Sequence, residues 1–307
     1  MTAPSLLCVG NLTIDETVIA GTTTTALGGD ALFAALAARR ELTDVRMLAP
    51  VGTDLPAPLL RSVADAGIRV ESARPRTSPT VRNRITYAAD GSRVWDLLLG
   101  EEAFDVMSVY PEDVSPAALT ATGVLVSAMS LQSQLALGPW LREATRRRAS
   151  TVYLDLQEDY VQGHEDELLA LLGTCDVFMP SEIEATALAH TTDLDEAARI
   201  FRAHGADVVV IKTAERGCVL ATADGTTTVP TEVVTPVDST GAGDAFCGGF
   251  AAAHVQGADL ETAARAGAAA ARVAISSHGV DALLASHGAP GTAEHGTPAD
   301  ETTAVTR

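Results

Sequence analysis

The sequence predicts an α/β fold: a mainly parallel β-sheet covered by helices on both faces, with a small second β-sheet beside it. Short apolar runs alternate with segments of helical periodicity, the pattern of parallel strands joined by helical crossovers. Two stretches break this alternation: 16–28 is rich in β-branched residues, and 80–98 alternates like a hairpin. The chain has 307 residues, 47% of them hydrophobic, which is enough for one large α/β domain or two small ones.

The strands of the main sheet are expected where short apolar runs are bounded by polar or turn-forming residues. These runs are 6–14, 45–52, 68–73, 123–129, 151–156, 175–181 and 207–213. Helices are expected where apolar residues recur at helical spacing, at 30–42, 57–67, 240–256 and 259–276, and helical sequence also follows each central strand. Residues 217–231 are expected to form a hairpin that turns at Asp224-Gly225.

The two stretches that break the alternation predict a small β-sheet outside the main one. Residues 80–98 alternate as a hairpin that turns at Asp90-Gly91, and 16–28 supplies further strand sequence. Together they are interpreted as a lid; an ordinary surface excursion is the alternative. Residues 286–307 are rich in Gly, Pro and Thr without periodicity, so a disordered C-terminal tail is expected after a single domain at 1–285.

Composition excludes several partners. The net charge of −19 is spread along the chain and repels nucleic acid and anionic membranes, so neither is expected to bind. No apolar run is long enough to span a membrane, and the N-terminus lacks the basic region of a signal peptide. The four cysteines are scattered, which indicates a reduced, cytoplasmic protein without structural zinc or disulfides.

Lysine usage is unusual. Lys212 is the only lysine among 21 basic residues. A coding preference for arginine explains this bias as well as a functional reason does. In a chain this acidic, a nucleotide site needs local positive groups and a divalent cation.

The stretch "TPVDSTGAGDAFCGGFAAAHVQG" (235–257) predicts a glycine turn that leads into a buried helix. Gly241 and Gly243 let a ligand approach the backbone, and Ser239 or Thr240 is suited to cap the helix. The free amides and dipole of a helix N-terminus favour an anion. Asp244 lies in the first turn, where the dipole is expected to keep it ionised. It is therefore a candidate general base for phosphoryl transfer, and a simple helix-terminal charge is the alternative.

Three other phosphate-binding classes do not fit. A Walker loop needs Gly-Lys followed by Ser or Thr, but Lys212 follows Ile211. The "VVIK" run resembles the ATP lysine strand of protein kinases, yet no H-R-D or D-F-G run follows it. A dinucleotide motif "GAGDAF" has Phe246 in place of its third glycine, and too little chain remains for the strands that must follow.

The motif "DSTGAGDAF" (238–246) closely resembles the C-terminal signature D-[ST]-T-G-A-G-D of the ribokinase-like (PfkB) carbohydrate kinase family. Other segments resemble the family in the same order: "CVGNLTIDE" (8–16), "LGGDALFAALAARR" (27–40), "PVGTD" (50–54), "ADGSR" (89–93) and "DVFMPSEIEA" (176–185). The resemblance covers about residues 5–280. It implies a three-layer fold with a β lid, and an ATP- and Mg²⁺-dependent kinase for a small sugar or related polyol.

The resemblance also implies roles for individual residues. Asp244 is the implied catalytic base, and the backbone amides of 241–244 form an anion hole. The implied residues are Gly241, Ala242, Gly243 and Asp244 for catalysis; Asp15, Gly28, Gly29, Asp30 and Phe33 for the substrate; Lys212, Gly217, Thr240, Gly241 and Gly243 for the nucleotide; and Glu184 for magnesium. Asp15 is expected at the carboxyl end of the first strand, where open α/β sheets bind ligands. An exposed apolar lid would favour a homodimer.

Three positions depart from the family pattern. Ser181 replaces the asparagine of N-x-x-E, Phe33 replaces a polar sugar contact, and Ala214 replaces the first glycine near the phosphates. These departures keep two alternatives open. One is a nucleoside kinase, with Phe33 stacking on the base, and the other is a kinase relative that senses a metabolite without turnover. Arginines 82, 84 and 93 on the lid would suit a substrate carboxylate or phosphate, or a solvated hairpin face.

Overall fold

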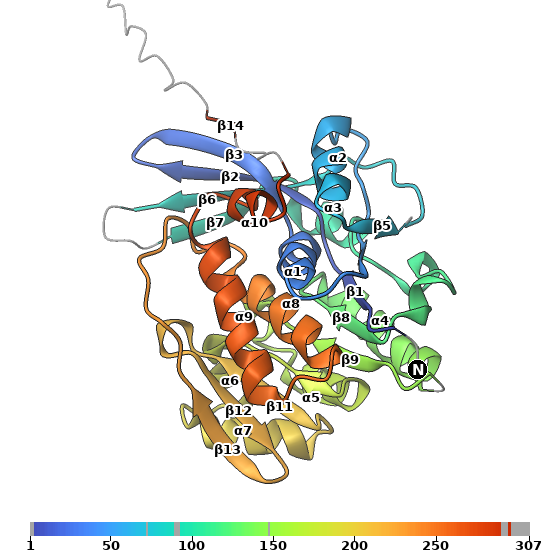
Figure 1. Cartoon of the computed structure of the whole chain (residues 1–307), viewed down its shortest axis with the longest axis vertical. Coiled ribbons are helices and arrows are strands. Elements are labelled where there is room, and N and C mark those ends of the chain that lie inside the picture. Colours follow the sequence, from blue (N-terminus) through green and yellow to red (C-terminus); the bar gives the residue numbers. More distant parts are fainter. Residues whose placement is uncertain (1–2, 72, 89–92, 147, 290–293, 296–307) are drawn as a thin grey trace, which may run out of the picture.

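The predicted central strands pair into one large sheet. The computed structural model describes residues 3–71, 73–88, 93–146, 148–289 and 294–295 (Figure 1). Within these ranges the sheet has nine strands in the order β13-β12-β11-β10-β9-β8-β1-β4-β5. Their bounds are β1 Leu6–Val9, β4 Val45–Leu48, β5 Arg69–Glu71, β8 Gly123–Val126, β9 Thr151–Leu154, β10 Val177–Phe178, β11 Val208–Lys212, β12 Cys218–Thr222 and β13 Gly225–Val229. In this order the strands from β11 through β1 to β5 are all parallel, and β12 and β13 are added antiparallel, which confirms the mainly parallel sheet.

Helices cover both faces of this sheet and enclose two apolar cores. Alternation along β1 shows why: Leu6 and Cys8 belong to the core under α1, α8 and α9, whereas Leu7 and Val9 belong to the core under α4 to α7. The helices are α1 Asp30–Arg39, α2 Ala57–Asp65, α3 Gly100–Val106, α4 Leu131–Thr145, α5 Glu165–Leu171, α6 Glu182–Ala189, α7 Leu194–Ala203, α8 Ala242–Val255, α9 Leu260–Ala274 and α10 Asp281–Ala285. Figure 1 shows α8, α9 and α1 lying together over one face.

A second, smaller sheet lies at one end of the molecule (Figure 1). We call it the lid sheet. It has the order β14-β3-β2-β6-β7. Its strands are β2 Thr13–Ile19, β3 Thr22–Gly28, β6 Val81–Tyr87, β7 Arg93–Leu97 and β14 Glu294–His295. The separate small sheet predicted from 16–28 and 80–98 is therefore confirmed, while its predicted turn at Asp90-Gly91 lies outside the described residues.

Three sequence predictions need correction. The strand expected at 6–14 is two strands, because the chain leaves the main sheet after Val9 and enters the lid sheet at Thr13. The β12–β13 hairpin pairs Thr222 with Gly225, so its turn is Ala223-Asp224 rather than Asp224-Gly225. Most of the predicted disordered tail lies outside the described residues, but Glu294–His295 pair with β3. That pairing uses backbone groups that an edge strand otherwise leaves open.

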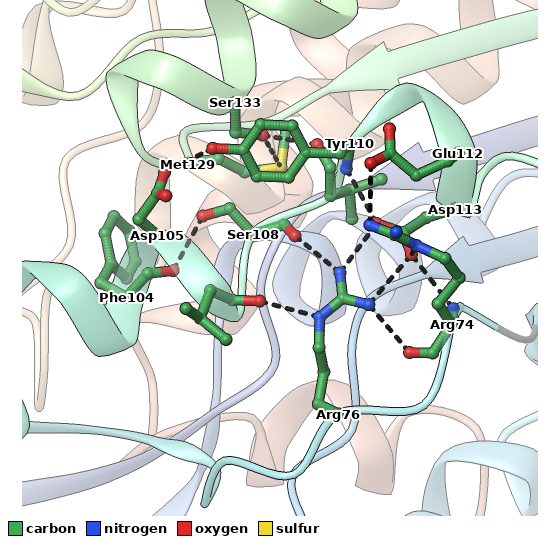
Figure 2. A network of polar contacts seen from close by, with 12 residues as sticks. Arg74, Arg76, Phe104, Asp105, Ser108, Tyr110, Glu112, Asp113, Met129 and Ser133 are labelled. Atoms are coloured by element: carbon green, nitrogen blue, oxygen red, sulfur yellow. Dashed lines mark hydrogen bonds and ion pairs between the residues drawn. The ribbon is translucent and has the colours of Figure 1, made fainter.

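A buried network of polar contacts fixes the segment that leads into the lid sheet (Figure 2). Asp113 is its centre, with a side chain that is 0% exposed. Arg76 donates to both carboxylate oxygens at 3.0 and 2.8 Å, and also to the carbonyls of Val106 and Ser108. Arg74 adds a bond from its Nε at 3.1 Å. These bonds lower the pKa of Asp113 against the opposing effect of burial.

We expect Asp113→Ala to destabilise the protein by about 3–5 kcal/mol, because it leaves the buried Arg76 charge without a partner. The matched control is Arg74→Ala: the Arg74 side chain is 50% exposed, so its loss should cost at most about 1 kcal/mol. Urea unfolding of the two variants and the parent measures both values. An equal loss of unfolding free energy in the two variants would contradict the expectation that the buried residue contributes more.

Candidate active site

Two cavities meet at the N-terminus of α8. The lid-side cavity, about 390 Å³, lies between the lid sheet and the main sheet and includes Asp15, Asp30 and Asp244 in its walls. The α9-side cavity, about 350 Å³, is lined by Gly217, Pro236 and residues of α8 and α9. Lys212 and Gly243 line both cavities. Any group that passes from one cavity to the other would pass these two residues.

The glycine turn forms the wall between the cavities. Gly241 is the N-cap of α8 and has φ 73°, a left-handed conformation that glycine adopts without strain. A Cβ atom at Gly241 would lie 2.3 Å from the ring of Phe33, so α1 packs directly against the turn. The amide of Ala242 donates a long bond of 3.4 Å to the carbonyl of Ser239. The amides of Gly243 and Asp244 lie in the first turn, where no preceding carbonyl of the helix is available to them.

Asp244 is the third residue of α8 and lines the lid-side cavity. Burial raises its pKa to about 7, the negative charge of Asp155 adds to the rise, and Lys212 opposes it. The helix dipole was expected to keep Asp244 ionised at neutral pH, but with a pKa of about 7 the group is only partly ionised there. Loss of hydration and a neighbouring carboxylate outweigh the dipole. A carboxyl group with a pKa near neutrality is well matched to proton transfer at neutral pH.

Asp15 is a buried carboxylate on the lid sheet, not at the end of the first strand as predicted. The Thr13 hydroxyl donates to its Oδ1 at 2.7 Å, and Asn83 Nδ2 of the adjacent strand β6 donates at 2.9 Å. Burial raises the pKa of Asp15 to about 6 although both hydrogen bonds lower it. Gly28 makes room for this group, since a Cβ atom there would lie 1.8 Å from Asp15 Oδ2. Gly29 caps α1 at φ 104° and lines the cavity.

Carboxylates are concentrated around the single lysine. Lys212 Nζ donates to both oxygens of Asp155, at 2.7 and 2.6 Å. Burial lowers the pKa of Lys212, but Asp155 outweighs it and the pKa is raised overall. A Cβ atom on Gly243 would lie 3.5 Å from Lys212 Nζ, which places the ammonium group beside the glycine turn. Asp30, the first residue of α1, has a pKa well above its ordinary value because of burial and the charge of Asp244.

Glu184 lies in the wall of the lid-side cavity and caps its own helix. Its Oε2 accepts from the amide of Ser181 at 2.7 Å, while the Ser181 hydroxyl accepts from the Glu184 amide at 3.2 Å. Ser181 thus serves as an N-cap at the position where the family has asparagine. Burial and the charge of Asp155 raise the pKa of Glu184 to about 7.

The acidic lining of the lid-side cavity fits a magnesium ion. Within the described ranges no three His, Cys, Asp or Glu side chains form a ready-made metal site. Mg²⁺ commonly needs only one or two carboxylates, with waters and phosphate oxygens completing its shell. Burial is the main cause of the raised pKa of Glu184 and the charge of Asp155 is the second. A divalent cation beside Glu184 would favour its charged form.

The α9-side cavity contains the predicted nucleotide residues Lys212 and Gly217. Gly217 has φ 93°, and a Cβ atom there would lie 2.1 Å from the carbonyl oxygen of Val229. Ala214 also has a positive φ of 49°, which explains why the family places glycine at this position. Thr240, predicted for the nucleotide, instead lines the lid-side cavity.

The lid arginines do not face the cavity. Because side chains alternate along a strand, Arg82 and Arg84 point away from the face that carries Asn83 and Ile85. Arg82 pairs with Asp54 at 2.6 Å, and Arg84 pairs with Glu16 at 2.6 Å. The interpretation of these two as a clamp for a substrate anion is wrong. The side chain of Arg93 lies outside the described residues.

Several residues of the site were missed from the sequence. Asp155 follows the apolar run of β9, and a polar residue at the carboxyl end of a parallel strand was an available signal. Asn83, Ile85, Trp95 and Phe104 line the lid-side cavity from segments whose pattern indicated only strand or loop. Phe33, predicted to contact the substrate, lines the lid-side cavity and packs against Gly241, and its role in binding stays a prediction.

Sequence and structure comparisons find similar proteins over nearly the whole chain. A sequence model described as pfkB family carbohydrate kinase matches residues 5–286. A cytidine kinase from Thermococcus kodakarensis is 28% identical over 276 residues, covering 87% of this chain and 94% of that protein. A deoxyribokinase from Salmonella typhi is 29% identical over 244 residues, 77% of each chain. The crystal structure of adenosine kinase from Sinorhizobium meliloti has a TM-score of 0.79 at 20% identity, over 93% of this chain and 98% of that one.

Proposed function

The chain belongs to the pfkB family of carbohydrate kinases, and we propose that it transfers the γ-phosphoryl group of ATP to a hydroxyl group of a small sugar or related polyol. It is a phosphotransferase with a hydroxyl acceptor. One observation carries the finer proposal: Lys212 and Gly243 line both the lid-side and the α9-side cavity, beside the first turn of α8 and the carboxylate of Asp244. An acceptor and a donor bound in the two cavities would react across that point.

In this proposal Asp15 and Asn83 orient the acceptor through its hydroxyl groups. Asp244 takes the proton of the reacting hydroxyl as its oxygen bonds to the γ-phosphorus and the bond to the β-phosphate oxygen of ATP breaks. The amides of the glycine turn, with Lys212, stabilise the negative charge on the transferring group. Positioning and fixed charge of this kind account for most of the catalysis in phosphoryl transfer.

Glu184 is the residue we propose to hold Mg²⁺, directly or through water. When bound, the ion would neutralise charge on the ATP phosphates. Lys212 and Gly217 would border the nucleotide, since both line the α9-side cavity. That cavity is largely apolar, with Val233, Ala268 and Ile275 in its walls, which suits an adenine ring.

The experiment that tests the proposal is ADP release from Mg-ATP over a panel of sugars, sugar acids, polyols and nucleosides. Turnover with one sugar or polyol group, dependent on both ATP and the acceptor, is the expected result. Binding of a sugar without any turnover would instead support the non-catalytic metabolite sensor and overturn the kinase proposal for this chain.

A nucleoside is the second candidate acceptor. Beside the polar pair Asp15 and Asn83, the lid-side cavity has an apolar side formed by Ile85, Trp95 and Phe104. Such a surface would hold a base by stacking and apolar contact. Turnover of nucleosides in the same panel, with a KM that rises in Trp95→Ala while the KM of free pentoses does not, would favour this candidate over a free sugar.

The activity of the free enzyme should depend on pH near neutrality. Because burial raises the pKa of Asp244 to about 7, the carboxyl group is protonated, and inactive as a base, below that pH. Glu184, also near 7, would lose metal affinity over the same range. We expect kcat/KM to fall by about tenfold to a hundredfold per pH unit below 7 and to be level above it. A profile that stays level down to about pH 5 would contradict this assignment.

Two further proposals concern the location of the protein in the cell and its oligomeric state. All four cysteines are free and buried, which supports a reducing, cytoplasmic location. Among the described residues no helix combines the length and apolarity needed to cross a bilayer. A lid-mediated homodimer stays a prediction, supported by the exposed apolar residues Val94 and Leu98. We expect sedimentation velocity to give a dimer that Val94→Asp converts to a monomer.

A further inference from the structure

Asp238 connects the lid sheet to the glycine turn. It is 2% exposed and starts the motif that leads into α8. Within its own loop, Oδ1 accepts from the amide of Thr240 at 2.9 Å. From the lid sheet, Tyr87 Oη donates to Oδ1 at 3.0 Å and Thr17 Oγ1 donates to Oδ2 at 3.3 Å. His278 Nδ1 lies 3.5 Å from Oδ2 on the α9 side.

Tyr87 also contacts the turn beyond Asp238. The amide of Ser239 donates to Tyr87 Oη at 3.4 Å, and the Ser239 hydroxyl lies 3.4 Å from the same oxygen. The Tyr87 hydroxyl therefore bonds to the carboxylate and to the next residue at once. Burial opposes ionisation of Asp238, but hydrogen bonds from Thr240 and Tyr87 lower its pKa, so the acceptor is a carboxylate at neutral pH.

The two lid donors share strands with the proposed acceptor site. Thr17 lies two residues beyond Asp15 on β2, and Tyr87 lies four residues beyond Asn83 on β6, so all four side chains are on one face of the lid sheet. Strands β2 and β6 are paired in register along their whole length. A shift of the lid sheet at Asp15 would therefore move Thr17 and Tyr87 as well.

The other side of the turn is held by rigid contacts. The amide of Val237 donates to the carbonyl of Ile275 at 2.8 Å, and Gly241 is packed on Phe33. Between the lid residues Ile85 and Trp95 and the turn itself lies a hollow of about 280 Å³. By contrast, the bonds from Thr17 and Tyr87 to Asp238 join the lid sheet directly to the turn.

We propose that Tyr87 and Thr17 are positioning residues that hold Asp238, and through it the amides of the glycine turn, in the orientation needed for phosphoryl transfer. The proposal rests on the proposed function for its catalytic meaning. Its structural part, the dependence of the turn on two lid hydroxyl groups, stands independently of the reaction. Neither residue touches the reacting atoms in this arrangement, so the expected effect is on turnover rather than on binding.

The test compares Tyr87→Phe and Thr17→Val with Thr86→Val, which alters an exposed side chain on the opposite face of β6. We expect Tyr87→Phe to lower kcat about tenfold while the KM values for ATP and acceptor change less than twofold. Amide hydrogen exchange at the hydrogen-bonded amides of Ser239, Thr240 and Ala242 should quicken about tenfold in Tyr87→Phe, less in Thr17→Val, and not in Thr86→Val. In a double-mutant cycle, Tyr87→Phe should add nothing to the loss caused by Asp238→Asn.

Unchanged exchange at Ser239, Thr240 and Ala242 in Tyr87→Phe, or fully additive losses in the cycle, would overturn the proposal. If the parent protein turns over no acceptor but exchange still quickens in Tyr87→Phe, the positioning contact is supported and only the proposed reaction fails. An equal rise in exchange throughout the chain would show a general loss of stability and count against a specific role for Tyr87.

Discussion

Replacement of Asp244 by Asn should lower kcat by about 10²–10⁴-fold, the range expected when a general base is removed. Asn has nearly the same shape, but its amide oxygen cannot take the proton of the acceptor hydroxyl. The Kd for ATP should change little, because the nucleotide is proposed to lie in the α9-side cavity, whose walls do not include Asp244. Steady-state kinetics and calorimetric titration of ATP separate these two quantities.

A matched control distinguishes catalysis from helix capping. Asp259 is the N-cap of α9, outside both cavities, and accepts from the amide of Thr262 at 2.7 Å. Asp259→Asn should leave kcat unchanged within about twofold. Thermal unfolding of Asp244→Asn should show no loss of stability, because the substitution removes one carboxylate from a site that already contains Asp155 and Asp30. Full activity in Asp244→Asn would refute the assignment of the base.

Replacement of Lys212 by Met should affect both stability and activity. The ammonium group is bonded to both oxygens of the buried Asp155, which would be left as an unpaired charge. Breaking such a pair costs about 3–5 kcal/mol. Lys212 also lies beside the glycine turn, where negative charge develops on the transferring group. Loss of its positive charge should therefore lower kcat by about 10²–10³-fold, the range seen when one hydrogen-bond donor to such a charge is removed.

Two variants separate these effects. Arg265→Met breaks an exposed pair with Glu261, whose side chains are 59% and 57% exposed, and should cost less than about 1 kcal/mol. Adding Asp155→Asn to Lys212→Met removes the unpaired charge, so stability in urea should largely return while kcat stays low. Recovery of both stability and kcat in the double variant would show that Lys212 only neutralises Asp155. If Lys212→Met lost neither stability nor kcat, that result would contradict the buried ion pair.

Much of the fold could be predicted because it depends on local patterns. Apolar runs followed by helical periodicity specify parallel strands and covering helices, and the β-branched stretches specify a separate sheet. The ends of an element could not be predicted where one continuous sequence pattern contains two strands. Residues 6–14 are mostly apolar and were predicted as one strand, yet the chain changes sheets after Val9. Only the packing of neighbouring segments shows that change, since Gly10 lies against α1 and Ser127.

The residues of the candidate site could be predicted where their role depends on backbone conformation or on position in a helix. Gly241, Gly243 and Asp244 form a short contiguous motif whose geometry follows from residue type. Asp155 and Asn83 could not be assigned in the same way, because their roles depend on partners 57 and 68 residues away in the chain. A polar residue after an apolar run indicates a place where a site could form. It does not indicate which distant residue will be its partner.

The sequence by itself determined the α/β fold class, the separate small sheet, the glycine turn at a helix N-terminus and the carboxylate in its first turn. The tertiary structure alone decided the charge state and the connections of that site. It buried Asp244 beside Asp155, which raised the pKa to about 7 where the helix dipole had predicted a lower value. It also brought Tyr87 to Asp238 across 151 residues. The physical reason is that helix propensity and turn geometry are local, whereas desolvation and the pairing of charges depend on which distant segments share one interior.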